Sequence, residues 1–358
     1  MKTYVIGFYL EKLYYSPQFE PVIRELIKRE VPYVVIIPKT RDRDEINQRE
    51  ESINYCKQNN FTYILEEEDC FCNTLVFGNT PHHIHTQFDK SAFINHGVWG
   101  GKTMNIEPGL NEVDVRFLDG KFLEEYLIEL YPEKKSIFYV SGYSKLDNYF
   151  KLTDDDRKRF LQERHLDTNK KTILYAPTFY PSSVLKMGKK FPEDFAEYNI
   201  ILKPHSHLFL RKKYRKDLHL LQTWATSPNV YLANFNETNI LPFLHAADLL
   251  ISDMSSAVFE FSGVGKPAII NMFLHYRPID RLFPHKVRKR LDISKFYLWE
   301  VGDTPKNYKE MVQYVRENLA NPDKNKTKRE ELSRYVVGEV DGKVSERIAD
   351  KLLELAKI

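Results

Sequence analysis

The sequence predicts an α/β protein with two Rossmann-like domains that face each other across a cleft. The chain has 358 residues, more than one usual domain of roughly 100–200 residues contains. Short apolar runs rich in β-branched and aromatic residues alternate with charged amphipathic stretches, as in parallel β-α-β layers. A charged segment at 151–171 separates two such series. We therefore predict domains at 1–150 and 151–358, with the last helix able to return to the first domain.

The first series begins with an apolar run, followed by residues 18–29, whose apolar side chains recur at helical spacing. Residues 41–59 form a strongly charged helix or loop. The strands predicted for this half are 4–10, 33–37, 61–65, 74–77, 92–95 and 137–140.

The second series has the continuous apolar runs that buried parallel strands require. Its predicted strands are 172–175, 200–202, 230–232, 249–251 and 268–271. Helices are predicted at 308–319 and 343–356, with a charged hinge at 322–329 between them.

Composition excludes several classes of protein. Hydrophobic residues make up 42% of the chain, which is enough for packed cores. The 53 Lys and Arg residues against 50 Asp and Glu give +3, too little for a dedicated nucleic-acid binder. Cys56, Cys70 and Cys72 suggest neither a disulfide framework nor a zinc site, so a reducing cytoplasm fits best.

The N-terminal apolar run at 3–10 resembles the core of a signal peptide, but Glu11 and Lys12 end it early. No stretch approaches the ~20 apolar residues that span a bilayer. We therefore expect a cytoplasmic protein whose membrane contact, at the inner face of the plasma membrane, is peripheral.

The first motif, at 95–103, follows a predicted strand and ends in Gly-Lys-Thr, as a phosphate loop does. The glycine that such a loop needs five positions earlier is replaced by His96, so the spacing is wrong. What remains is a histidine at a strand end that can act as a base near neutral pH, with Gly97, Trp99 and Lys102 beside it. The alternative is a histidine that only satisfies a hydrogen bond in a turn.

The second motif also follows a strand, 200–202, and contains Lys203 and His205. A structural loop histidine is the alternative reading here too. Two histidines at strand ends, one in each half, favour a shared cleft as their destination.

The third motif is the most specific of the three. A buried strand ends at Asp253, and Ser255 and Ser256 are candidate N-cap residues of the helix that follows. The free N–H groups and positive dipole of a helix N-terminus form an anion site. Glu260 lies one turn into the helix, where it could reach a ribose hydroxyl. A plain helix cap explains the serines but not the aspartate.

In their order along the chain, these motifs resemble the CDP-glycerol glycerophosphotransferase family, which makes teichoic-acid-like polymers with a GT-B fold. The resemblance covers about residues 75–275 and rests on the His96-Gly97 turn, the strand 173–178, the Lys203-Pro204-His205 element, the block from Asp253 to Ser256, Lys266-Pro267, and residues 142–147.

The resemblance implies a role for each matching residue. His96 matches the general base for the acceptor hydroxyl, and His205 matches a histidine that contacts the donor's phosphates. Asp253, Ser255 and Ser256 match the donor pyrophosphate block, and Thr178 faces the same cleft. Gly97, Trp99 and Lys102 lie on the acceptor side. Lys203 belongs to the matching element of the second histidine and is assigned to the donor site. Glu260 is assigned to the same site from its place in the helix and not from the resemblance.

The chain also departs from the family pattern. Val98 and Trp99 replace Thr-Pro after the first histidine, Ser206 replaces a proline, Met254 replaces an aromatic residue and Ser144 replaces a proline. Because the first turn lines the acceptor side, these changes leave the acceptor and the transferred group open.

The leading hypothesis is a transferase that moves a polyol-phosphate unit from CDP-glycerol or a related CDP-polyol to a hydroxyl of a lipid-linked or polymeric glycan acceptor, with release of CMP and no cofactor. A nucleotide-sugar transferase or epimerase of the same fold, and a non-catalytic polymer-binding protein, are the alternatives.

Two other groups of side chains rank lower. His82, His83 and His85 lack an obvious fourth ligand, so we predict no metal site. The basic runs 211–216 and 286–290 are usually solvated, but they could form a docking strip for an anionic surface.

Overall fold

The computed structural model describes residues 2–39, 48–80, 84–98, 106–133, 135–282 and 293–357. These residues form two compact units. The first unit contains the described part of residues up to Asn148 together with residues from Val337 onward. The second contains the described part of Tyr149–Val336.

The first unit is built on a seven-stranded sheet in which every pair of strands is parallel. Its spatial order is β3-β2-β1-β4-β5-β6-β7. Successive strands are thus added on one side of β1 up to β3 and on its other side from β4 onward, so the order of addition reverses between β1 and β4. The strands are β1 (Lys2–Tyr9), β2 (Tyr33–Ile37), β3 (Tyr63–Leu65), β4 (Cys70–Phe77), β5 (Gln87–Ile94), β6 (Val115–Leu118) and β7 (Ile137–Val140).

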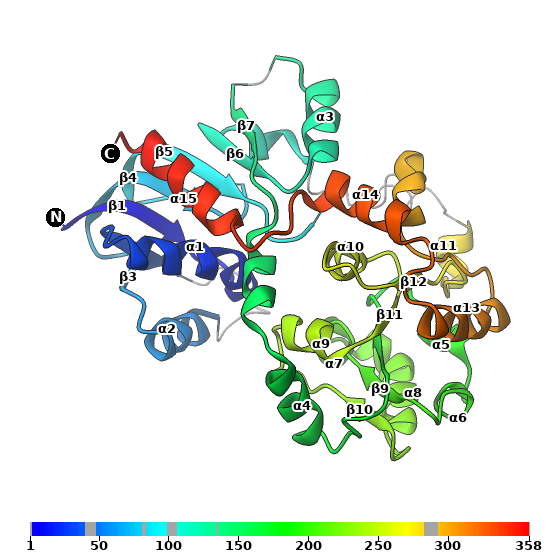
Figure 1. The fold of residues 1–358 in the computed structure, drawn as a ribbon. Helices are drawn as coiled ribbons and strands as arrows, with labels where there is room; N and C mark the ends of the chain where they lie inside the picture. Colours follow the sequence, from blue (N-terminus) through cyan, green and yellow to red (C-terminus); the bar gives the residue numbers. More distant parts are fainter. Residues whose placement is uncertain are drawn as a thin grey trace. The chain divides into compact units, whose positions relative to one another are not determined.

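Two helices from opposite ends of the sequence lie side by side on this sheet (Figure 1). The apolar faces of α1 (Ser16–Lys28) and α15 (Val344–Leu355) share one buried core with β1, β2, β4 and β5. The other helical segments of the unit are η1 (Leu13–Tyr15), α2 (Gln48–Gln58), η4 (Pro108–Asn111), α3 (Lys121–Leu130) and most of η5 (Ser144–Lys151).

The second unit repeats this plan with five parallel strands in the order β10-β9-β8-β11-β12. The strands are β8 (Thr172–Ala176), β9 (Asn199–Leu202), β10 (Val230–Leu232), β11 (Leu249–Ser252) and β12 (Ala268–Ile270). The reversal falls between β8 and β11. The predicted α/β class, with parallel sheets in two Rossmann-like halves, is confirmed.

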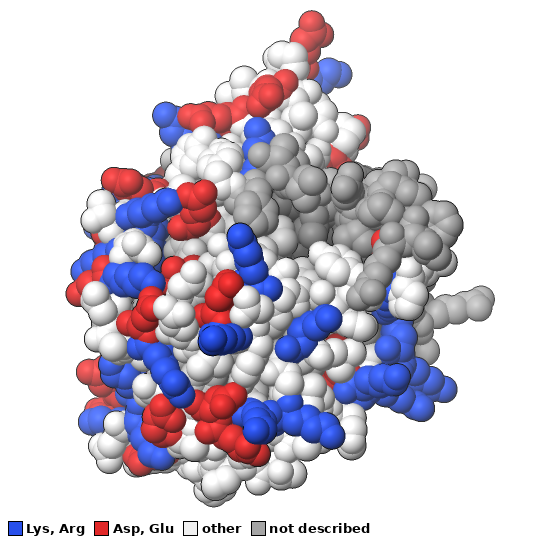
Figure 2. All heavy atoms as spheres, turned by 90° about the vertical axis from the view of Figure 1, so that its right-hand side faces the viewer, with Lys and Arg blue, Asp and Glu red and all other residues white. Residues whose placement is uncertain are grey.

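Helices surround this second sheet. They are α4 (Asp154–Gln162), α5 (Val184–Met187), α6 (Phe191–Asp194), α7 (His207–Leu210), η6 (Lys212–Tyr214), α8 (Arg215–Trp224), α9 (Leu241–Ala246), α10 (Ser256–Gly263), α11 (Pro278–Leu282), η7 (Ile293–Val301), α13 (Tyr308–Ala320) and α14 (Lys326–Val337). Charges of both signs are interspersed over much of the face shown in Figure 2.

All eleven predicted strands are present, but β6 was not predicted. The reason is Arg116, whose charge interrupts the apolar run and yet lies buried in the strand. Its guanidinium contacts the Phe93 ring at 5.4 Å and donates a hydrogen bond to Asn111. A charged residue is normally expected in contact with solvent, but here a cation–π contact and a hydrogen-bond partner stabilise the buried guanidinium.

The predicted hinge at 322–329 is wrong, because α14 begins at Lys326. The buried Arg329 side chain donates hydrogen bonds to the carbonyl oxygens of Lys324, Gly265 and Pro322. Backbone acceptors therefore hold a charged residue inside the structure, where its charge suggested an exposed linker.

Asp147 fixes the start of the last helix of the first unit. Its buried carboxylate accepts hydrogen bonds from the backbone N–H groups of Val344, at 3.1 Å, and Ser345, at 2.6 Å. An anion at a helix N-terminus satisfies donors that have no partner within the helix.

We expect Asp147→Ala to lower the free energy of unfolding by about 2 kcal/mol or more, because two buried N–H groups lose their acceptor. Urea denaturation followed by circular dichroism measures this. The exposed Asp89→Ala is the matched control, expected to change stability by less than about 0.5 kcal/mol. Equal effects of the two substitutions would contradict the capping role.

Candidate functional site

His96 follows β5 at the carboxyl edge of the first sheet and is half-buried. Its Nδ1 lies 2.7 Å from the carbonyl oxygen of Gly78, which follows β4. A carbonyl oxygen only accepts, so Nδ1 must carry the proton. In the neutral ring, Nε2 then holds the lone pair, which is the form that a general base needs.

Neighbouring residues fix the position of the His96 ring. Tyr14 contacts it edge-on at 5.2 Å between centroids, and Tyr15 lies 5.1 Å away. Gln18 Nε2 donates to the His96 carbonyl oxygen at 3.1 Å. Gly78 must be glycine, because a Cβ there would lie 2.6 Å from the Tyr15 ring.

Of the other residues predicted on the acceptor side, only Gly97 lies within the described residues. Gly97 is half-buried, and an added Cβ would meet no atom of the described residues within 4 Å, so their packing does not require glycine there. Trp99 and Lys102 lie outside the described residues.

In the second unit, Asp253 follows β11 at the reversal point of the sheet and has no exposed surface. One carboxylate oxygen accepts from the backbone N–H of Thr178, at 2.9 Å, and lies 3.3 Å from the Thr178 hydroxyl oxygen. The other accepts from the backbone N–H of Ser183, at 3.1 Å. Asp253 therefore holds the loop that follows β8, and a direct contact with donor phosphates stays a prediction.

Further buried hydrogen bonds stabilise this loop. The Ser183 hydroxyl lies 2.9 Å from the Tyr175 hydroxyl and accepts from Asn271 Nδ2 at 3.0 Å. The Thr178 hydroxyl donates to the carbonyl oxygen of Pro181 at 2.7 Å. Ser183 and Asn271 were missed by sequence reasoning, because a single serine or asparagine outside a motif carries no signal of burial.

Ser255 is the N-cap of α10, and its hydroxyl accepts from the backbone N–H of Ala257 at 3.4 Å. Ser256 is the first residue of this helix, and both serines are partly exposed. The N-cap prediction for Ser255 is confirmed. Glu260 lies within the helix and is only 3% exposed. Its proposed contact with a ribose stays a prediction.

His205 and Lys203 follow β9, the strand beside β8. His205 is exposed, and its Nδ1 accepts from the backbone N–H of His207 at 3.2 Å. Its ring lies 4.9 Å from that of Phe179, which neighbours Thr178 in sequence. The Lys203 ammonium lies 5.5 Å from the Phe243 ring. Thr178, Asp253 and His205 thus meet around one loop.

No group of three or more His, Cys, Asp and Glu side chains suited to a metal ion occurs among the residues that the structure describes. His82 and His83 lie outside those residues, and His85 is exposed. Within the described ranges, no helix has both the length and the apolar character needed to cross a membrane.

Comparison with known proteins bears on this arrangement. A family model described as CDP-glycerol:poly(glycerophosphate) glycerophosphotransferase matches residues 109–354. A teichoic acid poly(ribitol-phosphate) polymerase of Bacillus spizizenii is 28% identical over 229 residues, which are 60% of this chain and 33% of the relative. The chain therefore spans about a third of that relative's length.

Two solved structures have a similar fold. The wall teichoic acid polymerase TagF has a TM-score of 0.62 at 16% identity, with 99% of this chain and 89% of that chain covered. A UDP-N-acetylglucosamine 2-epimerase has a TM-score of 0.57 at 15% identity, with 98% and 95% covered. At this identity the likeness shows the fold, which is the predicted GT-B type.

Asp253 generates a pH prediction. Burial raises its pKa to about 6, although hydrogen bonds from the loop act in the opposite direction. An aspartate in an unfolded chain titrates near pH 4. Between about pH 4 and 6 the folded state thus keeps a proton that the unfolded state has lost. The free energy of unfolding should fall by about 2–3 kcal/mol as pH rises through this window.

Urea denaturation from about pH 4 to 7 measures this fall. Asp253→Asn removes the titrating group, so its stability should lack this part of the pH dependence, while Asp89→Asn should retain it. Parallel curves for wild type and Asp253→Asn would contradict the prediction.

Proposed function

The chain belongs to the CDP-glycerol:poly(glycerophosphate) glycerophosphotransferase family, and we propose that it transfers a glycerol-phosphate or related polyol-phosphate unit from a CDP-activated donor to an acceptor hydroxyl. The acceptor is a lipid-linked or polymeric glycan of a teichoic-acid-like or capsular polymer, and CMP is released. The observation that carries this proposal is the Nδ1 hydrogen bond of His96 to a carbonyl oxygen, which leaves Nε2 as the proton acceptor.

Each residue has a defined part in the proposed reaction. The acceptor oxygen forms a bond to the β-phosphorus of the donor, and the bond from that phosphorus to CMP breaks. The acceptor proton passes to Nε2 of His96. The N-terminus of α10 at Ser255 and Ser256, together with His205, stabilises negative charge on the transferred group and on CMP. Positioning and electrostatics supply the rate enhancement, as is usual in phosphoryl transfer.

We expect His96→Ala to lower the rate of CMP release about 100-fold or more, because general-base catalysis contributes that much. Binding of CDP-glycerol, measured by thermal shift, should persist. His205→Ala should lower both the rate and the binding. His219→Ala, an exposed histidine on α8, is the matched control and should behave as wild type. Wild-type CMP release by the His96 variant would overturn the role of His96, whereas no CMP release by wild type would favour the non-catalytic alternative.

The fold alone also fits a nucleotide-sugar enzyme, as the similarity to an epimerase illustrates. A thermal-shift panel of CDP-glycerol, CDP-ribitol, CMP-sugars and UDP-sugars separates the two hypotheses. We expect CDP-polyols alone to raise the melting temperature, because a ligand that binds only the folded state stabilises it. A rise with UDP-sugars alone would favour the sugar enzyme.

We further propose that the protein works at the inner face of the plasma membrane through peripheral contact. The support is the run 211–216, in which Arg211, Lys212, Lys213, Arg215 and Lys216 are exposed. The second basic run, at 286–290, lies outside the described residues. Each basic residue near an anionic surface contributes about 1 kcal/mol.

Sedimentation with vesicles tests the membrane contact. Lys212→Glu with Lys213→Glu should weaken binding to phosphatidylglycerol vesicles about tenfold or more. The matched control is Lys309→Glu with Lys328→Glu, which changes the charge equally on α13 and α14. Equal binding by wild type to phosphatidylcholine and phosphatidylglycerol vesicles would contradict an electrostatic contact.

A further inference from the structure

Arg277 lies at the carboxyl edge of the second sheet, on a segment that follows β12 and is tied to the loop after β8. The backbone N–H of His275 donates to the carbonyl oxygen of Ser182 at 2.7 Å. The backbone N–H of Arg277 donates to the Tyr180 hydroxyl at 3.0 Å. Asp253 binds the same loop through Thr178 and Ser183. The Arg277 segment is therefore linked through this loop to the aspartate that lies shortly before α10 in the sequence.

The guanidinium of Arg277 rests on two aromatic rings. Its central carbon lies 4.4 Å from the centroid of Tyr180 and 5.5 Å from that of Tyr214. The nearby acid Asp280 accepts a hydrogen bond from the Tyr180 hydroxyl. Among the described residues, the guanidinium makes no hydrogen bond or ion pair of its own, although Asp217 lies close enough to interact electrostatically.

The same aromatic cluster reaches His205. The Phe179 ring lies 4.9 Å from His205 and 6.0 Å from Tyr214, on which Arg277 also rests. His205 and Arg277 therefore contact one group of rings at the ends of β8 and β9. Burial and the nearby Asp253 carboxylate raise the pKa of Tyr276, so this segment lies close to Asp253, two residues before the N-cap of α10.

Cation–π contacts with two rings restrict the half-buried Arg277 guanidinium, whose planar N–H edge matches two oxygens of a phosphate group. We propose that Arg277 is a further donor-binding residue, which contacts the diphosphate of a nucleoside-diphosphate donor beside the N-terminus of α10. The inference rests on the proposed function only in taking the donor to be a nucleoside diphosphate. Arg277 belongs to none of the three sequence motifs.

Isothermal titration of CDP-glycerol, UDP-N-acetylglucosamine and cytidine into wild type and variants tests the proposal. Arg277→Ala should weaken binding of the diphosphate donor about tenfold to 100-fold, the usual loss of a charge-assisted hydrogen bond. Binding of cytidine, which has no phosphate, should change less than about twofold. Arg277→Lys keeps the charge but not the planar fork and should fall between.

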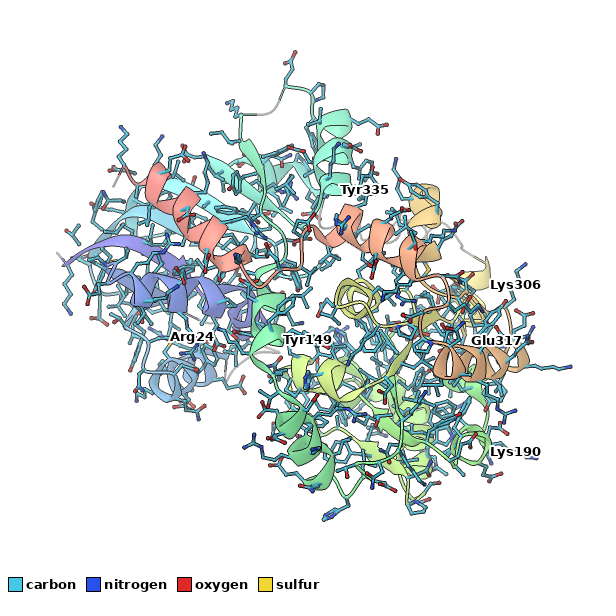
Figure 3. The ribbon with its side chains drawn as sticks, in the orientation of Figure 1. Arg24, Tyr149, Lys190, Lys306, Glu317 and Tyr335 are labelled. Atoms are coloured by element: carbon cyan, nitrogen blue, oxygen red, sulfur yellow. The ribbon has the colours of Figure 1, made fainter. Side chains whose placement is uncertain are left out.

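The matched control is Arg316→Ala, which removes an equal charge from the exposed face of α13, the helix that Glu317 marks in Figure 3. An unchanged melting temperature without ligand shows that each variant is folded. Donor binding by Arg277→Ala within twofold of wild type, or equal losses in Arg277→Ala and Arg316→Ala, would overturn the inference.

The outcome for wild type separates this inference from the proposed function. If wild type binds the UDP-sugar and not CDP-glycerol, the proposed function is wrong, and Arg277 is judged on the UDP-sugar by the same comparison. If wild type binds neither donor, both proposals fail.

Discussion

Parallel pairing of every strand in both sheets is the constraint on which the candidate sites depend. It brings all carboxyl ends of a sheet to one edge, and each connection must return through a segment that crosses a face of the sheet. Register then decides which residues meet. Ala176 pairs with Ser252, so Thr178 and Asp253 lie just beyond paired positions and can form a hydrogen bond. In the first sheet the same rule brings the carbonyl of Gly78 to His96.

In both units, backbone C=O and N–H groups form hydrogen bonds to the candidate site residues. A carbonyl oxygen selects the tautomer of His96. In the proposed anion site the N–H groups at the start of α10 would be the donors, and the side chain of Ser255 serves as the helix cap. Asp253 does not need to touch a substrate to matter, because its burial and its hydrogen bonds determine where the loop after β8 lies. Because backbone groups are present at every residue, a list of side-chain types describes such sites incompletely.

The sequence predicted the strands and the positions of His96, His205 and Ser255 well, because apolar periodicity and strand-end motifs are local properties. The prediction failed where a partner elsewhere in the chain allows a charged side chain to be buried or restricts the size of a side chain. Arg116 lies inside a strand because its guanidinium makes a cation–π contact with Phe93 and a hydrogen bond to Asn111. Arg329 is buried because three backbone carbonyls from two segments accept its hydrogen bonds. The requirement for glycine at position 78 likewise comes from the Tyr15 ring, many residues away in the chain.

The place of α15 has a consequence for biosynthesis. In the part of the chain that the structure describes, the second unit is formed by residues between Tyr149 and Val336, whereas the core of the first unit also needs Ile348 and Leu352, which are translated later. On a ribosome folding normally proceeds from the N-terminus, but the core of this first unit lacks α15 until the residues of the second unit have been synthesised. The later unit can complete its core first, and the apolar face of α1 waits for the last helix to leave the exit tunnel. A stalled or truncated nascent chain would thus carry a finished second unit beside an unfinished first one.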